Sequence, residues 1–235
     1  MTALAASARP AGRLGLQVFR RDPYHGRQPA HPLSVLIHAL PRPGLRLDVN
    51  LWRIQNLPNL WRGLWRIWLG MLLGVPVHYG AAFLRVTIGA TGETIELGLA
   101  SLRVVTTAGV TEIATRFAGT SAASIANFKY MGFGTGTTAE NITDTALVTE
   151  LTTEYATDNT RPTGSQSAAT NVYTSVATLS PDGAGTLAIT ETGIFAQAAT
   201  GGGTLLDRFK YAAVNLTRSA DSLQVTFNFT ITAGG

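Results

Sequence analysis

Near the C-terminus, residues 223–232 alternate without exception between apolar and polar side chains. The apolar members are Leu223, Val225, Phe227, Phe229 and Ile231, and the polar members are Gln224, Thr226, Asn228, Thr230 and Thr232. Because successive side chains of a strand point to opposite faces, this segment is predicted to be a strand with one apolar face and one polar face. Such strands belong to antiparallel sheets, sandwiches or barrels. The polar face carries no charge, so it can face water or lie against another polar protein surface.

The rest of residues 86–235 is dominated by Thr, Ala and Gly, in short alternating runs separated by turn residues. Residues 86–88 and 94–97 flank a Gly-Ala-Thr-Gly turn and are predicted to form a hairpin. Apolar residues at helical spacing follow Thr106 and Thr107, either of which can cap a short helix. Further strands are predicted within residues 102–105, 149–155, 172–179, 187–195 and 205–216, with a loop at 158–167.

A Ser-Pro-Asp-Gly turn at residues 180–183 predicts that the strand at 172–179 pairs with the strand at 187–195. About eight strands are expected in all, which is the number in a jelly roll. We therefore expect an all-β fold, a jelly-roll-like antiparallel β-sandwich with one short helix.

Composition changes sharply at residue 85. Up to Arg85 the chain holds eleven arginines and two aspartates, a net charge of +9; from Val86 onward, seven basic and twelve acidic residues give −5. All four Trp, all four His and eight of the ten Pro precede Val86. We therefore predict a basic N-terminal arm, residues 1–85, and a β-sandwich domain, residues 86–235. The basic arm can attract phosphate, lipid head groups or acidic protein, whereas the acidic domain repels nucleic acid.

The arm itself has two parts. Residues 1–50 contain six prolines, which disfavour long helices and central strands, so an extended segment that gains structure on a partner is expected. In residues 51–73, Trp61, Leu64, Trp65 and Trp68 follow the i, i+3, i+4, i+7 spacing of one helical face. Trp and Arg are the residues enriched at interface hot spots, so a partner-binding surface is predicted here. Its candidate residues are Trp52, Arg53, Trp61, Arg62, Trp65, Arg66 and Trp68.

Two other interpretations of this segment remain open. It can contact a membrane, although the uninterrupted apolar stretch at 67–77 is shorter than the roughly 20 residues needed to cross one. It can also pack on the protein's own core. No signal peptide is evident, and a later start at Met71 would leave residues 1–70 outside the mature protein.

No catalytic, cofactor or metal site is predicted. The chain has no cysteine, which fits synthesis in a reducing cytoplasm. The Gly-rich loop at 132–136 lacks the Gly-Lys-Ser/Thr ending of a phosphate loop. Every histidine (His25, His31, His38 and His78) lies in the arm, away from the serines of the β domain and without zinc-site spacing. The acidic pairs Glu93/Glu96 and Glu150/Glu154 are expected to be solvated.

The run at 128–139 reads FKYMGFGTGTTA and is followed by Asp144-Thr145-Ala146-Leu147 and Glu150. The runs at 189–195, 203–208 and 221–235 fit the same pattern. Together these runs resemble small structural proteins of tailed bacteriophages. The resemblance covers roughly residues 102–235 and implies a virion protein with a β-sandwich fold, in the manner of capsid cement or decoration proteins. The segment before residue 86 departs from that pattern, so the resemblance says nothing of its role.

From these observations we expect a non-enzymatic decoration protein on the outer capsid surface, made in the host cytoplasm. Its partners would be the major capsid protein and itself, as a homotrimer, with the arm bridging neighbouring capsid subunits. Nucleic acid is not expected as a partner. The alternatives are a tail or fibre component with a receptor-binding or baseplate role, and a membrane-associated protein held by residues 61–84.

Overall fold

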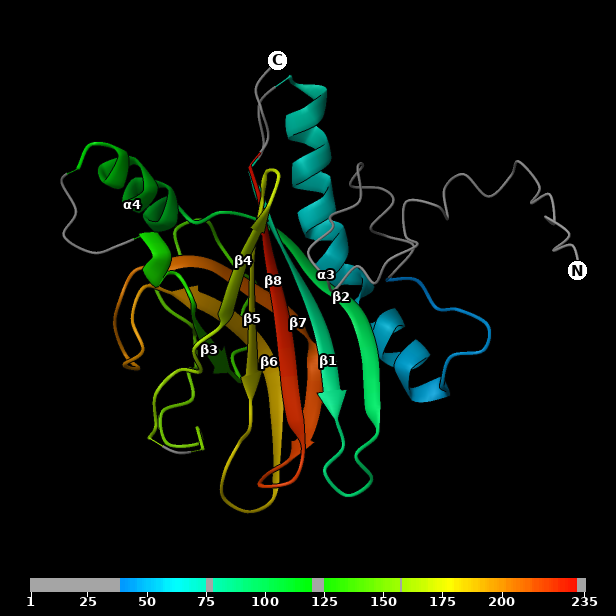
Figure 1. Ribbon diagram of the computed structural model, residues 1–235. Helices are drawn as coiled ribbons and strands as arrows, with labels where there is room; N and C mark the ends of the chain where they lie inside the picture. Colours follow the sequence, from blue (N-terminus) through cyan, green and yellow to red (C-terminus); the bar gives the residue numbers. More distant parts are fainter. Residues whose placement is uncertain (1–38, 75–77, 120–124, 157, 232–235) are drawn as a thin grey trace, which may run out of the picture.

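A computed structural model of the protein describes residues 39–74, 78–119, 125–156 and 158–231. These residues form two antiparallel sheets and two α-helices, so the fold is mostly β and sandwich-like, as predicted (Figure 1). The first sheet has the order β2-β1-β8-β5-β4 and the second the order β3-β6-β7. The strands are β1 (Tyr79–Thr87), β2 (Thr94–Val104), β3 (Tyr130–Gly134), β4 (Ser165–Ala169), β5 (Val172–Leu179), β6 (Thr186–Phe195), β7 (Leu205–Thr217) and β8 (Ser222–Thr230).

The alternating segment near the C-terminus is β8, which lies between β1 and β5 in the middle of the larger sheet. Its apolar side chains fill the space between the two sheets; the Phe227 ring meets the Phe209 ring edge-on, with centroids 5.4 Å apart. The polar face is buried as well. Thr226, Asn228 and Thr230 are all under 6% exposed, and the Thr174 hydroxyl donates to the Asn228 side-chain oxygen at 2.8 Å. The sequence allows this face to meet either water or another protein surface, and in the structure it lies against protein.

The hairpin and the short helix, which are predicted from local sequence signals, are confirmed. Strands β1 and β2 form the predicted hairpin, with Val86 paired to Ile95 across the turn. Helix α4 (Thr107–Phe117) begins after Thr106, whose hydroxyl accepts the Gly109 N–H at 3.0 Å and so caps the helix.

Four predictions about strands and loops are wrong. The segments at 94–97 and 102–105, predicted as separate strands, belong to the single strand β2, which ends at Val104. Strand β5 pairs with β4 and β8, and β6 pairs with β3 and β7, so residues 172–179 and 187–195 belong to different sheets. The chain passes from one sheet to the other through the turn at 180–183. The residues of this turn determine that the chain reverses direction, but they do not determine which strand the following strand pairs with. Residues 149–155 form only isolated bridges at Glu150 and Tyr155, and β4 begins inside the predicted loop at 158–167. Every residue of β4 is exposed, so its sequence has no alternation of apolar and polar side chains that would predict a strand.

Helix α3 (Leu47–Leu72) lies beside β2, the edge strand of the larger sheet, as Figure 1 shows. Leu60, Leu64 and Ile67 are buried there, against Tyr79, Phe83, Leu99 and Leu102. Gly63 lies so close to the Leu102 carbonyl that a side chain at this position would overlap it. The composition boundary at residue 85 lies inside β1, so the basic segment contributes both a helix and an internal strand to the same layered structure. The predicted extended arm falls mostly on residues 1–38, outside the described residues.

Candidate protein-interaction surface

Helix α3 carries the dipeptide Trp-Arg three times, and the first copy points into the molecule. Trp52 is 8% exposed and its indole N–H donates to the Ala212 carbonyl at 3.0 Å. Arg53 is 5% exposed and donates to the carbonyls of Leu97 at 2.9 Å and Leu40 at 3.1 Å. These two predicted partner-binding residues are therefore engaged within their own chain, in line with the alternative of packing on the protein's core.

The other two copies, together with Trp68, point outward. Trp61, Trp65 and Trp68 are 64%, 50% and 44% exposed, and we call them the tryptophan face. The rings of Trp65 and Trp68 are 5.0 Å apart and tilted by 30°. Leu64, which the spacing grouped with them, is buried against the sheet. The tryptophans therefore lie outside the packed stripe of the helix, and large aromatic area is left accessible.

A cleft of about 640 Å³ opens between this part of α3 and the loop that follows β3. We call it the arginine cleft. Its lining residues are Trp61, Arg62, Trp65, Arg66, Arg103, Ala139, Glu140 and Asn141. Arg62 and Arg66 are exposed, whereas Arg103, at the end of β2, is only 3% exposed.

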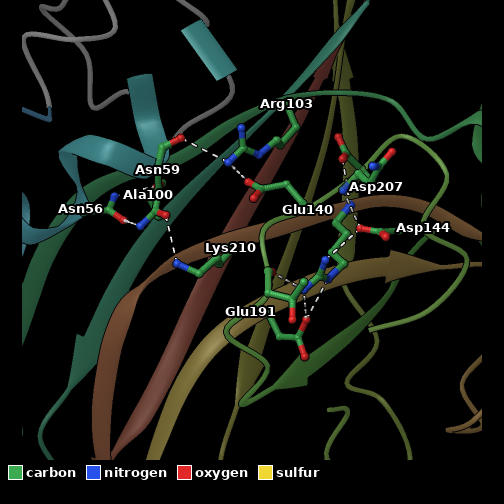
Figure 2. Close-up of polar contacts among 12 residues, drawn as sticks. Asn56, Asn59, Ala100, Arg103, Glu140, Asp144, Glu191, Asp207 and Lys210 are labelled. Atoms are coloured by element: carbon green, nitrogen blue, oxygen red, sulfur yellow. Dashed lines mark hydrogen bonds and ion pairs between the residues drawn. The ribbon is translucent and has the colours of Figure 1, made fainter. Parts of the chain in front are cut away.

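A buried polar network joins the cleft to the helix and the sheets (Figure 2). The Arg103 guanidinium forms an ion pair with the Glu140 carboxylate and donates to the Asn59 backbone carbonyl at 3.2 Å. The Lys210 ammonium donates to the Asn59 side-chain oxygen at 3.1 Å. Burial first, and nearby arginines second, lower the pKa of Lys210; these arginines are Arg62, Arg103 and Arg208. Positive charge is thus in local excess at this end of α3.

A second buried network holds the loop that forms the far wall of the cleft. The Arg208 guanidinium donates to Glu191 at 2.8 Å and to Asp144 at 2.8 Å, and Glu191 is fully buried. The same Glu191 carboxylate accepts the backbone N–H groups of Gly136 at 3.0 Å and Thr149 at 2.8 Å. Since the loop between β3 and β4 is anchored on either side of residues 139–141, the wall of the cleft is a supported structure.

This network also explains the glycine-rich loop at 132–136. Gly134 and Gly136 lie against the Glu191 side chain, and an added Cβ at either would approach it closely. The loop therefore cradles the protein's own carboxylate, which is a structural use of an anion-binding turn. The acidic pairs are likewise engaged in part: Glu150 accepts from Arg161 at 2.9 Å and Glu93 from Arg46 at 2.7 Å.

Asp207 is an isolated buried acid beside this network. It is 1% exposed, accepts the Arg208 backbone N–H at 2.8 Å, and has one carboxyl oxygen without a hydrogen bond, lying against Gly80. Burial raises the pKa of Asp207 well above its ordinary value.

In the described part of the chain, no three His, Asp or Glu side chains are grouped so that they could hold a metal ion. Nor does any helix within those residues combine the length and hydropathy needed to cross a membrane. Comparison of the chain with protein-family models, curated proteins and solved structures gives no match.

Sequence reasoning found five of the residues at this surface, the tryptophan face with Arg62 and Arg66, and missed Arg103, Glu140 and Asn141. Arg103 is one arginine in an alternating strand, and residues 140–141 lie in an irregular loop. No local pattern distinguishes them, because they become neighbours of α3 only through the fold.

Proposed function

We propose that this chain is a non-enzymatic structural protein of a tailed-bacteriophage virion that decorates and stabilises the capsid. It would attach through the tryptophan face and the arginine cleft, bridging neighbouring subunits of the major capsid protein. The observation that carries this proposal is three tryptophans on one well-supported helix, each with 44% or more of its surface accessible. Exposed apolar groups gathered in this way mark interaction sites on soluble proteins.

The binding free energy expected from these residues is consistent with attachment to the capsid in many copies. A buried Trp or Arg at an interface hot spot contributes roughly 2 kcal/mol or more, and the rigid helix limits the entropy lost on binding. If each molecule joins adjacent capsid subunits, the second contact forms at a high effective concentration. Modest affinity at each site is then sufficient for a stable coat.

The fold is also suited to such a role. Two sheets enclose a continuous apolar core, and the buried ion pairs are used in holding loops. In this proposal, the chain is a jelly-roll-like sandwich that assembles as a homotrimer in the host cytoplasm. The homotrimer then binds the outer capsid surface. The resemblance of residues 102–235 to tailed-phage structural proteins supports the same assignment.

Copy number in purified particles tests this function. A decoration protein is expected at a copy number comparable with that of the major capsid protein, measured by quantitative staining of virion gels. A few copies per particle would instead indicate a tail or fibre component, and recovery with membrane vesicles but not with particles would indicate membrane association. Either result would contradict capsid decoration.

Point variants test the attachment surface. The triple variant Trp61→Ala, Trp65→Ala, Trp68→Ala should lose binding to capsids stripped of the protein, because it removes the aromatic anchors without touching the core. The matched control is Phe117→Ala with Val110→Ala on α4, which removes exposed apolar groups elsewhere. Deleting residues 1–85 is unsuitable, since it would remove most of β1. Equal binding by the triple variant and the control would exclude the tryptophan face.

A further inference from the structure

Arg62 and Arg66 differ from most of the arginines around them. Arg103, Arg161 and Arg208 each contact a carboxylate, as do Arg46, Arg85, Arg116 and Arg218. In the described part of the chain, no carboxylate pairs with Arg62 or Arg66, although both line the cleft.

We propose that the arginine cleft binds an acidic protein segment, whose carboxylates pair with Arg62 and Arg66 while an adjacent apolar side chain packs on Trp61 and Trp65. This inference deepens the proposed function and depends on it only for the identity of the partner. It assigns to the cleft a ligand chemistry, carboxylates on a peptide, that is independent of which particle carries them.

The charge of the cleft favours an anion. Within its lining, Arg103 is balanced by Glu140, so Arg62 and Arg66 leave two positive charges without a counter-charge. Lys210 nearby adds a third cation whose hydrogen bond goes to a neutral amide oxygen. Guanidinium groups bind carboxylates through paired, charge-assisted hydrogen bonds, so two arginines one helical turn apart suit two carboxylates on one segment.

The surroundings favour a short acidic peptide over a nucleic acid. Residues 86–235 carry a net charge of −5, which opposes a long polyanion that extends beyond the cleft. One wall also presents the Glu140 carboxylate. A peptide can place its carboxylates on the two arginines alone, and its uncharged groups against the rest.

A second copy of this chain is a weaker candidate for the occupant. In the described residues, Glu93, Glu96, Glu112, Glu150 and Glu154 already contact arginines of their own chain. Among the accessible acids of the described β domain, this leaves Asp158 and Asp182 without an arginine contact, and Asp158 already accepts from the Thr160 hydroxyl at 2.7 Å.

The test uses the full chain and a fluorescein-labelled oligoglutamate peptide, with binding followed by fluorescence anisotropy. We expect binding that weakens as salt rises, and no binding of an oligoglutamine peptide of equal length. Arg62→Gln with Arg66→Gln should weaken oligoglutamate binding by at least about tenfold, because both charge-assisted pairs are lost. The control, Arg46→Gln with Arg218→Gln, makes the same change in net charge outside the cleft and should stay within about twofold.

A further variant, Arg62→Lys with Arg66→Lys, keeps the charge but removes the planar guanidinium group that can form two parallel hydrogen bonds to a carboxylate. It should bind with intermediate affinity, and it keeps the test valid if the glutamine variant folds poorly by circular dichroism. Equal weakening by the cleft and control variants would overturn the proposal, as would tighter binding of an oligothymidylate of equal charge. Self-association in light scattering that Arg62→Gln with Arg66→Gln abolishes would identify a second copy as the occupant and would also overturn it.

Failure here and failure of the proposed function are distinguishable. If oligoglutamate binds in the cleft but the protein is absent from particles, the cleft assignment stands and capsid decoration falls. If the Arg62→Gln, Arg66→Gln variant decorates particles as well as the unmodified chain, decoration stands and the acidic ligand is rejected.

Discussion

The first Trp-Arg pair of α3 and the two later pairs have the same composition and opposite environments. Trp52 and Arg53 are under 9% exposed and hydrogen-bonded within the chain, whereas Trp61 and Trp65 are at least half exposed, with Arg62 and Arg66 beside the cleft. Residue type alone therefore does not identify an interface. The same pair stabilises the fold at one position and is available to a partner at another.

Helix geometry accounts for the contrast. Each residue of an α-helix turns the chain by about 100°, so the nine residues from Trp52 to Trp61 place these two side chains about 180° apart around the axis. Trp65 and Trp68 fall within about 40° of Trp61 by the same count. Because one side of α3 packs on β1, β2 and β7, the first pair is enclosed and the later tryptophans are left outside.

The largest expected effect is on the enclosed pair. Trp52→Ala should lower the free energy of unfolding by about 3–5 kcal/mol, since it leaves a cavity and an unpaired Ala212 carbonyl. Trp65→Ala should change it by no more than about 1 kcal/mol. Urea denaturation followed by circular dichroism measures both free energies of unfolding. A similar loss of stability in the two variants would show that Trp52 and Trp65 do not differ in their structural roles.

A smaller effect is expected for the arginines. Arg53→Met retains most of the side-chain volume but leaves the Leu97 and Leu40 carbonyls without their donor, at a cost of about 1–3 kcal/mol. Arg62→Met should stay within about 0.5 kcal/mol, because this side chain is exposed. The same denaturation experiment applies. If Arg62→Met were the more destabilising of the two, Arg62 would have a structural role.

The last expected effect concerns how the stability of the folded protein depends on pH through Asp207. The pKa of Asp207 in the folded protein is raised above its ordinary value of 3.8, so the folded protein holds a proton that the unfolded chain releases. Its contribution to stability is therefore greatest below about pH 4 and falls as the pH rises through the folded-state pKa. Asp207→Asn should remove this slope from a series of denaturation curves. An unchanged slope would assign the pH dependence to other groups.

Sequence reasoning reached part of the candidate site. It found Trp61, Arg62, Trp65, Arg66 and Trp68 from composition and helical spacing. It also included Trp52 and Arg53, because residue enrichment does not distinguish the two sides of a helix. It did not find Arg103 and Glu140, which lie 37 residues apart in the chain and meet only when the loop after β3 lies beside the end of β2.

What the sequence determined by itself is local. The alternation of β8, the β1–β2 turn, the capped start of α4 and the helical spacing around Trp65 each depend on interactions among near neighbours along the chain. Packing across the whole molecule places β5 and β6 in different sheets, buries the polar face of β8 and forms the cleft beside α3. The physical reason is that backbone hydrogen bonds between strands are the same for any side chains. Strand partners are therefore selected by packing over the whole core, which no single segment contains.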